Sequence, residues 1–136
     1  MLITVGRVAH FNAAHRLFRP DWDEARNREV FGKCALPHYH GHNYDLRVEV
    51  TGPVDPETGF VIDLKVLADL IRDHVTERFD HQNLNLDVPE FAQLNPTAEH
   101  IAQVIWQILR NLLPAHLFLK VILYETPRNY AVCEGS

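Results

Sequence analysis

The stretch HGHNYDLRVEVT, residues 40–51, alternates between apolar and polar side chains as a half-buried β-strand does. Its apolar positions share one parity: Tyr44, Leu46, Val48 and Val50. Because successive side chains of a strand point to opposite faces, this segment is expected to lie with one face on a core. The residues that follow, 51–59, are rich in proline and glycine and predict a turn.

Three further segments favour strands on either side of this one. Residues 1–15 place apolar side chains at one parity, with Arg7 as the exception. Residues 117–125 and 129–135 are two largely apolar runs joined by a short turn. The chain is therefore expected to contain four strands, in two pairs separated by its middle third.

The middle of the chain has the period of two helices. Asp63 is expected to cap a helix over residues 64–78. Asn95 is expected to cap a second helix, with Pro96 at its first position, that continues until Pro114. Both segments repeat apolar side chains at helical spacing, so each is expected to bury one face.

The resulting order is ββααββ, which predicts an α+β fold. We expect a four-stranded antiparallel sheet with both helices on one face. Residues 17–38 show no clear period and are expected to form a long loop. No repeat or linker interrupts the sequence, so residues 1–136 are expected to form a single domain.

Composition excludes several classes of function. A formal net charge of -5 argues against a nucleic-acid-binding or anionic-membrane-binding protein. No apolar run approaches the ~20 residues that cross a bilayer, and the first residues lack the pattern of a signal peptide. A cytoplasmic protein is expected, in which Cys34 and Cys133 are free thiols.

A group of histidines near the start of the second strand suggests a metal site. His40 and His42 are two residues apart, so their side chains share a face of that strand. His15 ends the first strand and could meet them from there. Three histidines leave one position open, which is typical of a catalytic zinc ion. Iron, copper and nickel are also compatible with imidazole ligands.

Other interpretations of these histidines stay open. A strand that simply begins with polar residues would have the same sequence. His38 shares the parity of the pair and is a rival ligand, although its loop position leaves its direction undetermined. His10 has the opposite parity to His15 and is expected at the surface or behind the ligands.

Further residues are candidates for acid–base chemistry and ligand binding. Cys34 is either a small loop residue or a thiol activated by a nearby cation. Asp80 precedes His81, and a carboxylate beside a histidine can orient the ring for proton transfer. Glu125 ends an apolar strand, where a carboxylate could accept two parallel N–H donors from a ligand.

Several motifs, taken in order, resemble the 6-pyruvoyltetrahydropterin synthase / 6-carboxytetrahydropterin synthase family. The resemblance extends over nearly the whole chain. The motifs are FNAAHRL (11–17), FGKC (31–34), HGHNY (40–44), DPETGFVIDL (55–64), FDHQNLN (79–85), LDVPEFA (86–92), NPTAEH (95–100) and YET (124–126).

The resemblance implies the tunnelling fold, a homohexamer built as a dimer of trimers, and active sites at subunit interfaces. It implies a role for each matching residue: His15, His40 and His42 as Zn²⁺ ligands, Cys34, Asp80 and His81 as catalytic residues, Glu125 as the pterin anchor, and Thr97 and Glu99 as further residues of the pterin pocket. Without the resemblance, Thr97 and Glu99 would be explained by helix capping and dipole compensation.

The implied substrate is a small pterin, 7,8-dihydroneopterin triphosphate. Its conversion to 6-pyruvoyltetrahydropterin with loss of triphosphate is favoured over the alternative, which yields 6-carboxytetrahydropterin and acetaldehyde in the queuosine route. Ala35 and Leu36 depart from the polar pair expected after the cysteine. Lys33, Arg16 and Arg128 are candidates to contact the triphosphate. A zinc hydrolase and a non-catalytic assembly domain are the remaining alternatives.

Overall fold

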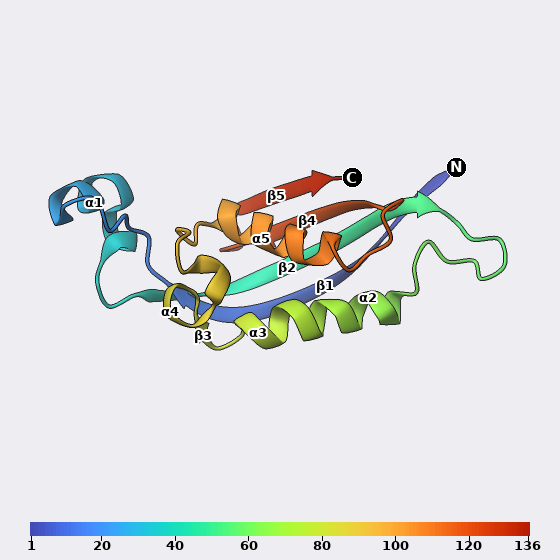
Figure 1. Cartoon of the computed structure of the whole chain (residues 1–136), viewed down its shortest axis with the longest axis horizontal. Coiled ribbons are helices and arrows are strands. Elements are labelled where there is room, and N and C mark those ends of the chain that lie inside the picture. The colour runs from blue at the N-terminus through green and yellow to red at the C-terminus, as the bar shows by residue number, and fades with distance from the viewer.

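The computed structural model describes residues 1–136 as a twisted sheet with helices packed along it (Figure 1). The strands are β1 (Leu2–His15), β2 (His40–Pro53), β3 (Gln82–Asn83), β4 (Phe118–Tyr124) and β5 (Tyr130–Gly135). The α-helices are α1 (Glu24–Phe31), α2 (Leu64–Ile71), α3 (Glu77–Phe79), α4 (Leu84–Asp87) and α5 (Ala98–Arg110).

The α+β class is confirmed, but the four-stranded ββααββ arrangement is wrong. The sheet has five strands in the order β3-β1-β2-β4-β5. The four long strands pair antiparallel, and β3 pairs parallel with β1 at Ala13 and Ala14. β3 has only two residues, and so short a strand has no periodicity that a sequence could display.

The long loop expected over residues 17–38 is also wrong, because this segment contains α1 and a 3₁₀ helix (Gly32–Ala35). Asn27 is the only buried residue of α1, so the helix has no apolar stripe for periodicity to reveal. Its start is nevertheless well formed, since the Asp23 side chain accepts a hydrogen bond from the Arg26 backbone N–H. Figure 1 shows α1 beyond the end of the sheet at which β1 ends.

The helix predicted over residues 64–78 is present, and Asp63 caps it as expected. It is one continuous rod in which a π-helical turn (Arg72–Thr76) joins α2 to α3. Its buried residues recur every four positions: Leu67, Ile71, Val75 and Phe79. On an α-helix with 3.6 residues per turn, side chains spaced four residues apart gradually rotate around the helix axis. The π turn has more residues per turn and reverses part of this rotation, so all four side chains face the sheet.

The second predicted helix exists as α5, but its start was misplaced by two residues. Thr97 is the N-cap and accepts a hydrogen bond from the His100 backbone N–H. The Asn95 side chain accepts instead from the Phe18 backbone N–H at 3.1 Å, so it is occupied in a tertiary contact. Pro96 therefore precedes the helix, and α5 ends at Arg110 rather than at Pro114.

The core lies between the sheet and the helices. The predicted inward residues of β2 are all buried, and Asn43, Asp45 and Arg47 on its other face are exposed. In the β1–β2 register His15 lies opposite His40 and Ala13 lies opposite His42. This register brings the histidines of two strands to one end of the sheet. None of the helices combines the length and the apolar composition that a membrane-spanning segment needs.

Candidate active site

The three predicted metal ligands lie together at the end of β1 and the start of β2. One ligand atom from each of His15, His40 and His42 falls within 4.8 Å of the others. The ring centroids are 4.6 Å apart for His15 and His40 and 5.0 Å apart for the other two pairs. Direct opposition of His15 and His40, with His42 two residues further along the same strand face, produces this convergence.

The Nε2 atoms of these three rings are buried and have no hydrogen-bond partner in the protein. Buried polar atoms are nearly always satisfied, so three unpartnered nitrogens in one place require an explanation. A divalent cation bound by the three lone pairs would satisfy all of them at once. The donor set suits zinc, and it leaves coordination positions for another ligand.

The tautomer of His15 also fits metal binding. Its Nδ1 lies 2.8 Å from the Pro96 carbonyl oxygen, which can only accept, so Nδ1 carries the proton and Nε2 has a free lone pair. Burial lowers the pKa of His15 to about 4. The hydrogen bond to Pro96 raises this pKa, and the nearby His40 and His42 lower it further. His15 is therefore neutral at pH 7, as a metal ligand must be.

Cys34 lies in the 3₁₀ helix next to this end of the sheet. The Leu17 backbone N–H donates to the Cys34 carbonyl oxygen at 2.8 Å, which ties the cysteine segment to the end of β1. Burial raises the pKa of the Cys34 thiol, and the negative charge of Glu125 raises it further. The chain by itself therefore keeps Cys34 protonated at neutral pH.

Glu125 follows β4 and faces the histidines. Its carboxylate oxygen Oε1 is 4.0 Å from His42 Nε2, and about a fifth of its side chain is exposed. Its backbone N–H donates to the Asn129 carbonyl oxygen at 3.0 Å, which closes the turn between β4 and β5. The carboxylate is thus held at the edge of the histidine cluster and remains accessible to a ligand.

Asp80 and His81 form the expected pair, but they lie away from the histidine cluster within one chain. Asp80 Oδ2 is 2.8 Å from His81 Nδ1, and Asp80 Oδ1 accepts from the Asn12 backbone N–H at 2.8 Å. The Asn12 contact lowers the pKa of Asp80, and the His81 contact lowers it further. The His81 side chain is 83% exposed, and Asn12 has the opposite parity to His15 on β1. This pair therefore faces solvent rather than the cluster of its own chain.

Thr97 and Glu99 lie at the start of α5, close in sequence to the carbonyl that holds His15. Thr97 caps the helix, and Glu99 is exposed in its first turn. His38 is exposed, and the three-histidine cluster does not include it. His10 is also exposed and lies outside this cluster, as its parity predicted.

Two neighbours of the cluster were not predicted from the sequence. One is the Pro96 carbonyl, because a backbone atom has no signature in a sequence. The other is Tyr44, which was recognised only as a core residue. Its fully buried ring lies beside His15, with the hydroxyl 3.3 Å from His15 Nδ1. Tyr44 follows His42 by two residues, so the two side chains share a face of β2, and this spacing could have predicted that Tyr44 lies beside the cluster.

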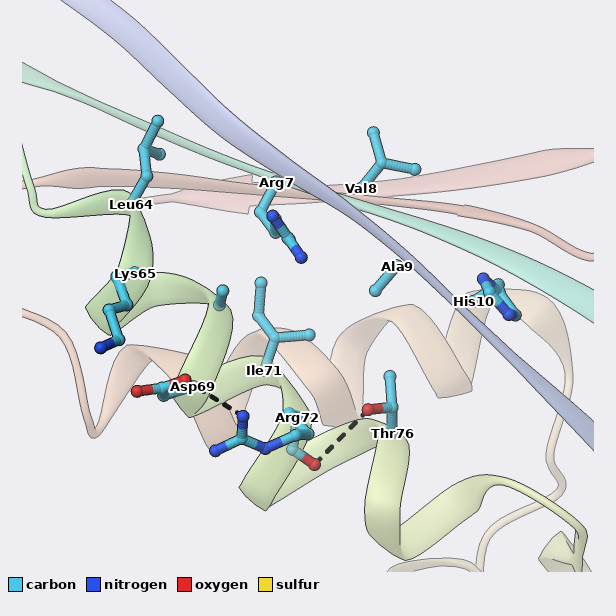
Figure 2. A pocket seen from close by; sticks show the side chains of 11 residues that line it. Arg7, Val8, Ala9, His10, Leu64, Lys65, Asp69, Ile71, Arg72 and Thr76 are labelled. Atoms are coloured by element: carbon cyan, nitrogen blue, oxygen red, sulfur yellow. Dashed lines mark hydrogen bonds and ion pairs between the residues drawn. The ribbon is translucent and has the colours of Figure 1, made fainter.

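A separate groove lies between β1 and α2, with a volume of about 650 Å³ (Figure 2). Arg7, His10, Lys65 and Arg72 are among the residues that line it. The groove includes none of the three clustered histidines, Cys34 or Glu125. The histidine cluster and Glu125 therefore form a site separate from this groove, at the end of the sheet where β1 ends.

Residues 4–136 match the family described as 6-pyruvoyl tetrahydropterin synthase. The chain belongs to this family. The resemblance inferred from the ordered motifs is thereby confirmed.

Relatives within the 6-pyruvoyl tetrahydropterin synthase family cover most of the chain. The 6-pyruvoyl tetrahydrobiopterin synthase of Pongo abelii is 41% identical, over 97% of this chain and 91% of its own length. The Drosophila melanogaster protein of the same name is 42% identical, over 92% and 75%. The solved structure of Caenorhabditis elegans 6-pyruvoyl tetrahydropterin synthase superposes with a TM-score of 0.93 at 38% identity, covering 100% of this chain and 97% of that one.

Proposed function

We propose that this protein is a zinc-dependent 6-pyruvoyltetrahydropterin synthase, which converts 7,8-dihydroneopterin triphosphate to 6-pyruvoyltetrahydropterin and eliminates triphosphate. The observation that carries this proposal is the convergence of three unpartnered histidine nitrogens at the sheet end beside Cys34 and Glu125. The names of the relatives support the same lyase reaction.

Zinc held by His15, His40 and His42 would polarise the side-chain hydroxyls of the substrate and favour the thiolate of Cys34. Glu125 would accept hydrogen bonds from the 2-amino group and N3 of the pterin, a pair of donors that matches the two oxygens of a carboxylate. Thr97 and Glu99 would line the same pterin pocket. Cys34 would then remove a proton from the substrate side chain as it lies along the pocket.

Asp80 and His81 would exchange protons with the substrate of a neighbouring chain. Within one chain this pair points to solvent, away from the histidine cluster. A second copy that docks its histidine cluster against the pair would complete the acid–base set. The exposed pair supports active sites at subunit interfaces, each containing residues of two chains. We propose a homohexamer, a dimer of trimers, as the assembly that forms these interfaces.

We also propose that residues 1–136 act as one pterin-synthase domain. A single cluster of 23 buried hydrophobic residues joins the sheet to the rod formed by α2 and α3 and to α5. The site residues lie at the edge of this cluster, so their positions depend on one shared core.

A turnover assay tests the proposed reaction. Purified full-length protein, loaded with zinc, is incubated anaerobically with 7,8-dihydroneopterin triphosphate, and the products are identified by mass spectrometry. Formation of 6-pyruvoyltetrahydropterin and triphosphate without acetaldehyde is the expected result. Acetaldehyde with 6-carboxytetrahydropterin would replace the proposed product by the alternative one.

Cys34→Ala separates pterin chemistry from the other classes. Turnover of the pterin should be lost while zinc content is retained, because Cys34 is not among the clustered nitrogen ligands. A zinc hydrolase would keep its activity in this variant. Absence of turnover by metal-replete, folded wild-type protein would contradict the proposed function.

A further inference from the structure

A groove of about 540 Å³ lies between α1 and the segment that contains Cys34. Three arginines line it, Arg16, Arg19 and Arg28, whereas Glu24 is the one carboxylate among its lining residues. The groove therefore carries an excess of positive charge, although the whole chain has a formal net charge of -5. A polyanion would be drawn to such a recess.

The groove adjoins the candidate active site through the chain itself. Arg16 follows His15, and Ala35, another lining residue, follows Cys34. The Leu17–Cys34 backbone hydrogen bond and a 2.9 Å bond from Arg16 Nε to the Ala35 carbonyl oxygen hold the two segments together. A substrate whose reacting side chain lies at the histidine cluster could therefore extend its tail into the groove.

We propose that this groove binds the triphosphate group of the substrate, with Arg16 and Arg28 as the principal anion-binding residues. This inference rests on the proposed function for the identity of the ligand. The shared chemistry is that of a linear polyphosphate, for which planar guanidinium groups are well suited.

Arg16 is positioned before any ligand arrives. Its Nε is committed to the Ala35 carbonyl oxygen, and its guanidinium carbon lies 4.0 Å from the ring centroid of Phe18. Neither of its terminal Nη atoms is hydrogen-bonded within the protein. No carboxylate oxygen lies within 4.0 Å of the Arg16 guanidinium, because all ion pairs of the chain involve other residues. An anchored guanidinium with free donors loses little entropy when it binds a phosphate.

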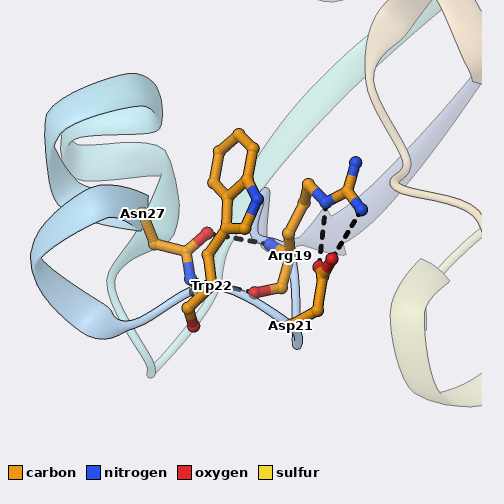
Figure 3. A network of polar contacts seen from close by, with 4 residues as sticks. All are labelled: Arg19, Asp21, Trp22 and Asn27. Carbon is orange, nitrogen blue, oxygen red and sulfur yellow. Dashed lines mark hydrogen bonds and ion pairs between the residues drawn. The ribbon is translucent and has the colours of Figure 1, made fainter.

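Arg28 and Arg19 differ in their availability. Arg28 is exposed in the last turn of α1 and forms no ion pair with the protein. Arg19 donates two hydrogen bonds to Asp21, at 2.9 and 2.7 Å, so its charge is largely compensated (Figure 3). Loss of the Asp21 charge should therefore release Arg19 and strengthen anion binding.

Asn27 gives the wall of the groove a fixed shape. Its side chain accepts from the Arg19 backbone N–H at 2.8 Å and donates to the Arg19 carbonyl oxygen at 3.0 Å (Figure 3). Its amide also lies 3.2 Å from the Asp23 carbonyl oxygen. Asn27 is only 5% exposed, so these bonds form in a protected place and hold residue 19 against α1.

The groove between β1 and α2 is a weaker candidate for the same ligand. Arg72 there pairs with Asp69 and Asp73, at 3.2 and 2.9 Å, which cancels its charge. No residue of that groove is adjacent in sequence to the clustered histidines or to Cys34. Only the groove beside α1 combines uncompensated arginines with proximity to the site.

Calorimetric titration of the full-length protein with inorganic tripolyphosphate tests the proposal, both zinc-loaded and after metal removal. Arg16→Gln is expected to raise the Kd about tenfold or more, and Arg28→Gln about three- to tenfold. Asp21→Asn is expected to lower the Kd about two- to fivefold. The matched control is Arg26→Gln, which removes the same charge from α1 but does not line the groove and should change the Kd less than twofold.

The same variants are then compared in turnover. Arg28→Gln should raise the KM for 7,8-dihydroneopterin triphosphate and leave the affinity for 7,8-dihydroneopterin, which lacks the triphosphate, unchanged. If Arg26→Gln weakens tripolyphosphate binding as much as Arg28→Gln, or if the arginine dependence vanishes when zinc is removed, the groove is not the binding site. If the wild type does not bind tripolyphosphate, the proposal is wrong.

The two proposals fail in different ways. Turnover with a KM that is equal in the wild type and in Arg28→Gln would retain the reaction and overturn the groove as the triphosphate site. Arginine-dependent tripolyphosphate binding without turnover would retain the anion site and overturn the proposed reaction.

Discussion

His42→Ala should abolish the stabilisation of this protein by zinc. A ligand that binds only the native state at 100 times its Kd contributes about 2.7 kcal/mol to the free energy of unfolding. An unfolding entropy of about 2.1 cal/mol/K per residue, over 136 residues, gives about 0.29 kcal/mol/K. Zinc at that concentration should therefore raise the Tm of the wild type by about 9 °C, and the Tm of the variant hardly at all.

The metal-free variant should itself be nearly as stable as the metal-free wild type. Truncation removes ring contacts of His42 with His15 and His40, whose centroids lie 5.0 Å away. It also removes one buried nitrogen that lacks a partner, and this offsets part of the loss. We expect a net change of about 1 kcal/mol in the free energy of unfolding.

Scanning calorimetry with and without zinc, together with elemental analysis, measures both quantities. His38→Ala is the matched control, because His38 is exposed and shares the parity that made it a rival ligand. This control should keep its zinc and the full Tm shift. A full zinc complement in His42→Ala, or loss of zinc from His38→Ala, would refute the ligand assignment.

Substitutions of Glu125, Asn27 and His15 should each have a measurable effect. Glu125→Gln should raise the Kd for 7,8-dihydroneopterin about 10- to 100-fold by calorimetry, because charged hydrogen bonds are lost, and should leave the zinc content intact; an unchanged Kd would exclude the anchor role. Asn27→Ala should lower the free energy of unfolding by about 2–3 kcal/mol in urea titrations, because the bonds that fix Arg19 and α1 disappear; a loss below about 0.5 kcal/mol would contradict this. The metal-free protein should lose about 3 kcal/mol of stability as the pH falls from 6.5 to 4. The folded pKa of His15, about 4, lies below its unfolded value, so the unfolded chain binds more protons in this pH range. His15→Gln should remove this part of the pH dependence.

The sequence predicted the parts of the fold that repeat. Parity along β2 identified Tyr44, Leu46, Val48 and Val50 as core residues, and all four are buried. Parity also indicated that His40 and His42 share a face. Alternation is a direct consequence of strand geometry, so it is visible in the sequence without knowledge of any partner strand.

The sequence missed the parts that depend on single tertiary contacts. α1 buries only Asn27 and so has no apolar stripe, and β3 consists of two residues. The cap of α5 was misplaced because Asn95 and Thr97 are both suitable capping residues. Only the fold, in which Asn95 bonds to the distant Phe18, determines that Thr97 is the cap.

In the candidate site, too, some features follow from local sequence patterns and others from tertiary contacts. The sequence by itself determined which histidines share a strand face, because this depends on local geometry, and its ordered motifs identified the family. Only the tertiary structure decided that His15 lies opposite His40, that the Pro96 carbonyl holds the His15 ring, and that the Asp80–His81 pair faces away from the cluster of its own chain. These facts depend on strand register and on contacts between residues more than 60 positions apart, which no local pattern encodes.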